Sequence, residues 1–137
     1  MSLVWREQLG VGNEQIDSDH KYLIEIINQV THSLKTIDQG KLSVSVDNLS
    51  RFLEVHCSRE EKIASAVGYE QISQLYESHV ALLVELNKIK LEIGKVDMAT
   101  STEHIRVFLG ELFSHIIKED LLMKPTLKKY SPSFVPR

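Results

Sequence analysis

The sequence predicts an all-α protein: an up-down-up-down antiparallel four-helix bundle with an N-terminal arm and a short C-terminal tail. All three prolines lie near the C-terminus, at Pro125, Pro132 and Pro136, so none interrupts the preceding chain. Four long segments before them repeat apolar residues with a helical period. The breaks between these segments are short, and short connections between long helices make sequential helices antiparallel.

Composition limits the classes of function. The chain has 137 residues, and we expect a single domain over residues 1–137. A formal net charge of −3 gives no basic surface for nucleic acid. No stretch approaches the roughly 18 apolar residues of a membrane span, and the N-terminus lacks the pattern of a signal peptide. The single cysteine precludes a disulfide framework. We therefore expect a cytoplasmic protein with no membrane or nucleic-acid partner.

An N-terminal arm punctuated by Gly10, Gly12 and Asn13 precedes the first helix, which we expect over residues 18–37. His20 is the notable residue of this helix, because it shares a face with apolar side chains at helical spacing. Those side chains are Leu23, Ile24, Ile27 and Leu34. The face that holds His20 is therefore the face that should pack into the core.

The second helix is expected over residues 42–66, after a turn at residues 38–40. His56 and Glu60 are one turn apart, within an otherwise apolar stripe. The stripe consists of Leu49, Phe52, Ile63 and Val67. Both polar residues should therefore point into the core.

The third and fourth helices are expected over residues 70–93 and 101–121, followed by an irregular tail over 124–137. His79 shares a face with Ile72, Leu75, Leu83, Leu86 and Ile93, and His115 shares one with Phe108, Glu111 and Leu122. Asp120 lies about 140° around an ideal helix from His115. It reaches the same centre only by leaning inward or through a local distortion of the helix.

Four histidines and Glu60 on core-facing stripes, together with Asp120 near the last of them, predict a metal centre. A buried imidazole or carboxylate without a partner costs several kcal/mol. Four isolated, hydrogen-bonded core histidines are the alternative, but polar core positions are rare unless paired. Imidazole and carboxylate together suit iron, manganese or zinc. A single zinc needs only four ligands, so six indicate two metals, which the carboxylates could bridge. The six are His20, His56, Glu60, His79, His115 and Asp120.

The same residues resemble the bacterial hemerythrins along nearly the whole chain. The resemblance rests on four runs: Ile16 to Leu23, His56 to Glu61, Gly68-Tyr69 with His79 ten residues later, and His115 to Asp120. It implies a four-helix bundle around two non-haem iron ions that bind O₂. It further implies that His20 and His56 hold one iron, that His79 and His115 hold the other, and that Glu60 and Asp120 bridge them.

Two positions depart from the pattern of that family. Leu75 stands where the family has a further histidine, so one iron would lose a ligand. Glu111 stands where the family usually has tryptophan, one turn before His115, and an ideal helix points it towards the core. We therefore expect Glu111 to be a seventh ligand or to lie close to the metal. Tyr76 is a further candidate, although ordinary helix packing explains it as well.

The sequence leaves two main functions open. The first is binding of O₂ or a related small ligand at the two irons, for storage, delivery or sensing. The second is a redox enzyme or redox sensor acting on peroxide or nitric oxide, which Leu75 and Glu111 favour because they alter the site. A third possibility, an interaction module without metal, is disfavoured by the number of polar core positions that remain.

Overall fold

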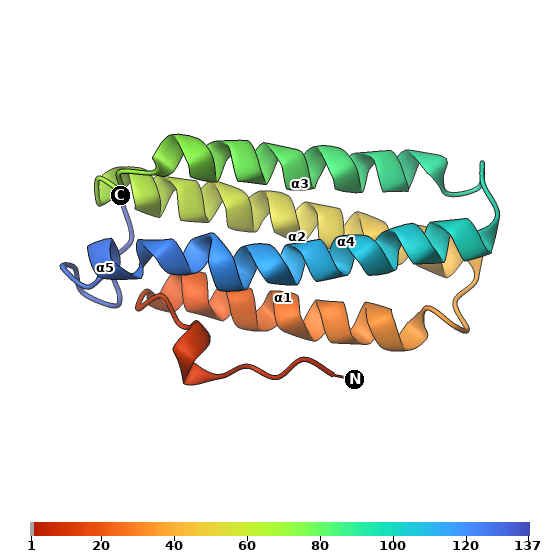
Figure 1. The fold of residues 1–137 in the computed structure, drawn as a ribbon, viewed down its shortest axis with the longest axis horizontal. Helices are drawn as coiled ribbons and strands as arrows, with labels where there is room; N and C mark the ends of the chain where they lie inside the picture. The colour runs from red at the N-terminus through yellow and green to blue at the C-terminus, as the bar shows by residue number, and fades with distance from the viewer. Residues whose placement is uncertain (1) are drawn as a thin grey trace.

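The computed structural model describes residues 2–137, which form the antiparallel bundle that the sequence predicts (Figure 1). Its long helices alternate in direction along the chain, and no β-strand occurs within the described residues. The four helices are α1 (Glu14–Ser33), α2 (Gln39–Ala66), α3 (Ile72–Glu92) and α4 (Met98–Lys118). None of the helices in this part of the chain combines the length and the apolar character that crossing a membrane requires.

Three of the four helices begin earlier than the sequence indicated, because capping side chains fix their first turns. The Asn13 side chain accepts a hydrogen bond from the Ile16 backbone N–H at 3.1 Å, so α1 begins at residue 14 rather than 18. Asp38 accepts one from the Lys41 N–H at 2.8 Å, and α2 begins at 39 rather than 42. Asp97 caps α4 in the same way. Such caps satisfy N–H groups that the helix itself leaves free.

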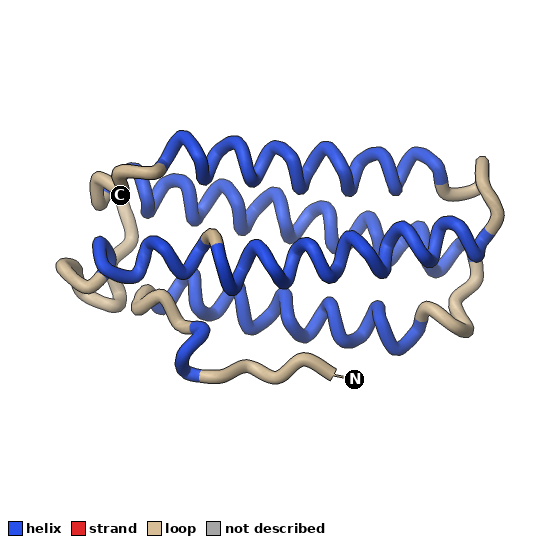
Figure 2. Tube along the Cα trace, viewed as in Figure 1, coloured by secondary structure: helices blue, strands red, loops and turns tan. Residues whose placement is uncertain are grey.

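The helix is distorted at the end of α4, and this distortion allows Asp120 to face the same centre as His115. Regular α-helix stops at Lys118, and a tight 3₁₀ turn, η2 (Asp120–Met123), follows it. The interruption is the short loop-coloured segment near the end of α4 in Figure 2. A short helix, α5 (Lys124–Leu127), comes next, so the tail is irregular only beyond it, not from residue 124 as expected. The tighter winding of a 3₁₀ turn changes the direction of a side chain relative to a continued α-helix.

The buried side chains form two apolar clusters with a polar layer between them. The larger cluster fills most of the bundle, and the smaller one lies at the end where α1 and α3 begin. Along α1 the order is Ile16 in the small cluster, then His20, then Leu23 in the large one. Along α3 it is Leu75, His79 and Leu82. The helices α1 and α3 therefore carry His20 and His79 between the same two apolar clusters.

Both ends of the chain pack on α1. The Leu3 backbone exchanges two hydrogen bonds of 2.8 Å with the Asn28 side chain, which holds the N-terminal arm along the helix. At the start of α1, the Glu14 N–H donates to the Pro132 carbonyl at 2.7 Å, and Asn13 Nδ2 donates to the Phe134 carbonyl at 2.8 Å. The tail thus closes the end of the bundle beside the smaller apolar cluster.

Asn13 has two roles, as helix cap and as anchor of the tail, so we expect Asn13→Ala to be costly. The free energy of unfolding should fall by about 1–2 kcal/mol from loss of the cap, and further from loss of the tail contact. Urea unfolding of the purified variant measures it. Asn48→Ala, at an exposed position within α2, is the control and should change stability by less than about 0.5 kcal/mol. Equal stability of Asn13→Ala and the wild type would contradict the assigned role.

Candidate metal centre

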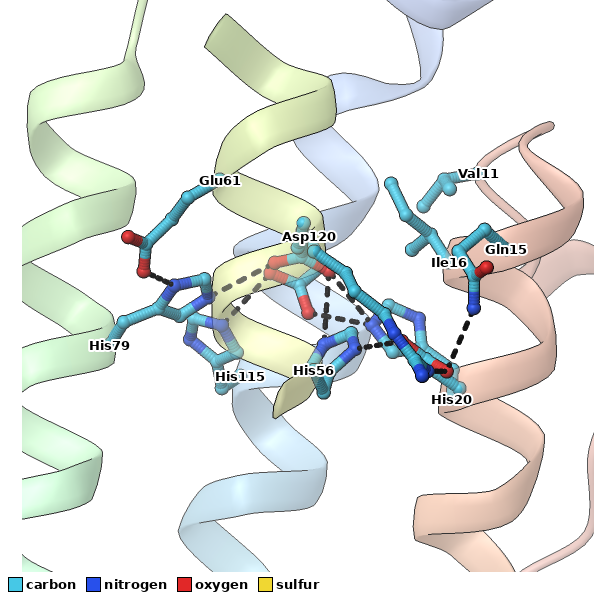
Figure 3. A network of polar contacts seen from close by, with 12 residues as sticks. Val11, Gln15, Ile16, His20, His56, Glu61, His79, His115 and Asp120 are labelled. Atoms are coloured by element: carbon cyan, nitrogen blue, oxygen red, sulfur yellow. Dashed lines mark hydrogen bonds and ion pairs between the residues drawn. The ribbon is translucent and has the colours of Figure 1, made fainter. Parts of the chain in front are cut away.

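Six side chains from four helices and the η2 turn meet in the polar layer (Figure 3). All are buried, and the most exposed of them, His115, has only 8% of its surface accessible. They are His20 from α1, His56 and Glu60 from α2, His79 from α3, His115 from α4 and Asp120 from η2. The structure therefore brings together the six residues that the sequence nominated as ligands.

The two carboxylates stand between two pairs of histidines. Glu60 Oε2 lies 3.1 Å from His20 Nε2 and 3.2 Å from His56 Nε2, whereas its Oε1 lies 3.0 Å from His79 Nε2. Asp120 Oδ2 lies 2.9 Å from His20 Nε2, and its Oδ1 lies 2.9 Å from His115 Nε2. Each carboxylate thus presents one oxygen to the His20 side and the other to the His79 and His115 side.

This geometry defines two overlapping four-residue groups, which share Glu60 and Asp120. Within each group, one potential ligand atom per residue lies within 4.8 Å of all the others. Ligand atoms about 2.1 Å from one ion are at most about 4.2 Å apart, so each group lies close to the spacing that binding one metal ion requires. The first group adds His20 and His56 to the shared pair, and the second adds His79 and His115.

Unsatisfied polar atoms also support a metal. Among the described residues, His56 Nε2, His115 Nε2 and both Asp120 oxygens are buried without a hydrogen-bond partner. Several of these atoms are close neighbours, as the distances above show, but they do not form well-directed hydrogen bonds. Buried polar atoms without a partner are costly, and coordination of a cation would satisfy all of them at once. The donor set, imidazole nitrogen with carboxylate oxygen, fits iron, manganese or zinc.

Two further carboxylates accept hydrogen bonds from the Nδ1 atoms of two of these histidines. Asp19 Oδ2 accepts a hydrogen bond from His56 Nδ1 at 3.0 Å, and its Oδ1 accepts one from Arg59 at 2.9 Å. Glu61 Oε2 accepts one from His79 Nδ1 at 2.6 Å. Such contacts fix the tautomer and leave Nε2 free to face the centre. The helical position of Glu61 predicts that it points away from the core, but its side chain still reaches His79 on α3. The sequence contained no signal that identified Asp19.

Contacts within the polar layer strongly shift the pKa values of His20, His79 and Glu60. Burial alone would lower the pKa of His20, but hydrogen bonds and negative charge from Asp120 and Glu60 raise it to about 10. Burial likewise opposes protonation of His79, and contacts with Cys57 and Glu60 raise its pKa to about 11. Burial would raise the pKa of Glu60, but the surrounding histidines hold it well below its usual value. The buried carboxylates are therefore stabilised by positive charge nearby, which either protonated histidines or a metal ion can provide.

Glu111 does not take the place that the sequence predicted. Its side chain is exposed, and it belongs to neither four-residue group. The buried stripe of α4 is centred on Leu112, with His115 about 60° away, at its edge. Glu111 lies about 100° from Leu112, outside the stripe. The sequence argument took His115 as the centre of the stripe, so the inward orientation it gave Glu111 is wrong.

Leu75 is buried in the smaller apolar cluster, one turn before His79 on α3. It brings no donor atom to the second group, which therefore has two histidines and the two shared carboxylates, as the first has. Tyr76, the other candidate near this position, is 40% exposed and lies outside both groups. No described side chain takes the place of a further histidine.

The fold and the polar layer agree with the comparisons. Residues 11–127 match the hemerythrin HHE cation-binding domain, and the chain belongs to this family. A bacteriohemerythrin of Stenotrophomonas maltophilia is 21% identical over 96% of this chain and 86% of its own length. That of Clostridium acetobutylicum is 23% identical over 85% of this chain and 95% of its own length. A hemerythrin mutant crystal structure, 19% identical, superimposes with a TM-score of 0.75 over 91% of this chain and 96% of its own.

The different positions of Glu60 and Glu61 generate a direct comparison. Glu60→Ala removes a group that faces three histidines, so metal content after purification without chelators should fall severely. Glu61→Ala removes only the support of His79, and metal affinity should fall by about 10–100-fold. Elemental analysis together with competition against a chromophoric chelator measures both. Greater loss in Glu61→Ala than in Glu60→Ala would contradict this order.

Proposed function

We propose that this protein holds two iron ions in the polar layer and binds O₂ or a related small ligand there. The observation that carries the proposal is the shared position of Glu60 and Asp120, each with one oxygen towards either histidine pair. In this assignment His20 and His56 bind one iron, His79 and His115 bind the other, and the two carboxylates bridge. Residues 1–137 would act as a single domain, in the cytoplasm.

The chain's own residues would orient and shield the centre. Asp19 and Glu61 hold His56 and His79 through Nδ1, so that the Nε2 atoms face inward. The apolar clusters on either side exclude water from most of the layer. When bound, two ferrous ions would supply the electrons that O₂ requires for binding. This apolar surround would help to retain a bound ligand, since apolar side chains do not solvate a charged species that leaves the centre.

A redox enzyme or sensor acting on peroxide or nitric oxide is the second candidate, favoured by two observations. Leu75 leaves the second group with two histidines, and an open groove reaches His115 from solvent. Fewer protein ligands and access for water favour turnover over retention of a ligand. The exposed position of Glu111 within that groove means that no bulky side chain at this position seals it.

Metal content and thermal stability test the proposed centre. We expect about two irons per chain after anaerobic reconstitution of chelator-treated protein with ferrous salt. Bound metal should raise Tm by about 5 °C or more, because it binds only the folded arrangement of ligands. Differential scanning calorimetry of metal-free and loaded protein is the measurement. Identical melting temperatures of metal-free and iron-treated protein, together with an iron content near zero, would contradict the proposal.

The reaction of the ferrous protein with O₂ separates the two candidate functions, and Leu75→His tests the effect of the missing histidine. O₂ is added anaerobically to ferrous protein, and the visible spectrum is followed with time. A lasting absorption band that disappears on removal of O₂ would indicate binding, and rapid conversion to a ferric spectrum would indicate redox chemistry. We expect the band of Leu75→His to last longer than that of the wild type, since the variant offers the second iron another ligand. Leu75→Met, of similar volume and without an imidazole, is the control.

A further inference from the structure

A groove of about 530 Å³ runs between α3 and α4 and ends beside the polar layer. Three carboxylates line it. Glu85 comes from α3, Glu111 comes from α4, and Glu119 directly follows α4. Among the described residues that line it, Lys118 is the one with a cationic side chain. Three carboxylates against one ammonium group give this part of the surface a negative potential.

His115 connects the groove with the candidate metal centre. It lines the groove and also belongs to the second four-residue group. It is more than nine-tenths buried, and its Nε2 lies 2.9 Å from Asp120 Oδ1 but forms no well-directed hydrogen bond among the described residues. The other three histidines of the candidate centre are more deeply buried, with 0%, 2% and 1% of their surface accessible for His20, His56 and His79. An ion that arrives through the groove therefore meets His115 before the other histidines.

We propose that this groove is the uptake route by which divalent cations, ferrous ion in particular, reach the centre, with Glu85, Glu111 and Glu119 steering them to His115. The proposal rests on the proposed metal-binding function and adds the path and the residues of loading. Negative charge at the mouth of a cleft raises the local concentration of cations and their rate of association. The three acids act on the rate, whereas the six buried residues determine how much metal is finally held.

The test follows cobalt(II) uptake by metal-free protein, because bound Co²⁺ absorbs visible light and does not react with O₂ under these conditions. Stopped-flow absorbance gives the association rate at low ionic strength. The groove variant is Glu85→Gln with Glu111→Gln and Glu119→Gln. The control is Glu25→Gln with Glu54→Gln and Glu77→Gln, which removes the same charge from exposed positions outside the groove lining. Circular dichroism verifies that both variants are folded.

We expect the groove variant to load about tenfold more slowly and the control to load within about twofold of the wild type. Both should reach the wild-type cobalt content. Raising the salt concentration should slow the wild type towards the groove variant, because screening weakens steering. A groove variant that loads at the wild-type rate, or a control that slows equally, overturns the uptake route while leaving the metal centre intact. Absence of cobalt binding in the wild type overturns the proposed function, and the route with it.

Discussion

Burial of six polar side chains at one level of the bundle constrains how the helices pack. Each would cost several kcal/mol if left without a partner, so they are tolerable only together. Glu60 alone contacts histidines from three helices within 3.2 Å. Sliding one helix past another by a single turn, about 5.4 Å, would break these contacts and leave charges unpaired. The polar layer therefore sets the axial register of the helices, which the surrounding apolar clusters alone would specify less sharply, because hydrophobic contacts are not directional.

Neighbouring residues in the sequence serve different helices in this layer. Asp19 supports His56 on α2, while His20, the next residue, faces the centre. Glu60 faces the centre, while Glu61 supports His79 on α3. Consecutive helical residues point about 100° apart, so one lies on the core face and the other towards the adjacent helix. Asp19 thus links α1 to α2, and Glu61 links α2 to α3. These contacts couple the orientation of the histidines to the packing of the helices.

Much of this arrangement follows from the sequence, because helical period and short breaks define four helices and place five of the six polar residues on inward faces; Asp120 reaches the centre through the η2 turn. The sequence could not give the rest for identifiable reasons. Asn13 and Asp38 extend helices beyond their apolar stripes, through hydrogen bonds that periodicity does not register. The support that Asp19 gives to His56 depends on a contact between helices. Glu111 was misplaced because the centre of a buried stripe depends on which neighbours pack against it, and His115 proved to lie at the edge.

The two four-residue groups contain the same kinds of donor, two histidines and two shared carboxylates, yet their surroundings differ. On one side, Arg59 pairs with Asp19, so the carboxylate that supports His56 is neutralised. On the other side, Glu61 supports His79 while partly exposed to solvent, and His115 borders an acidic groove. Negative charge behind a ligating imidazole strengthens it as a donor, whereas a neutralised carboxylate does so less. With Leu75 in place of a further donor, the asymmetry between the two groups lies in the charge and solvent access around the candidate ligands rather than in their number.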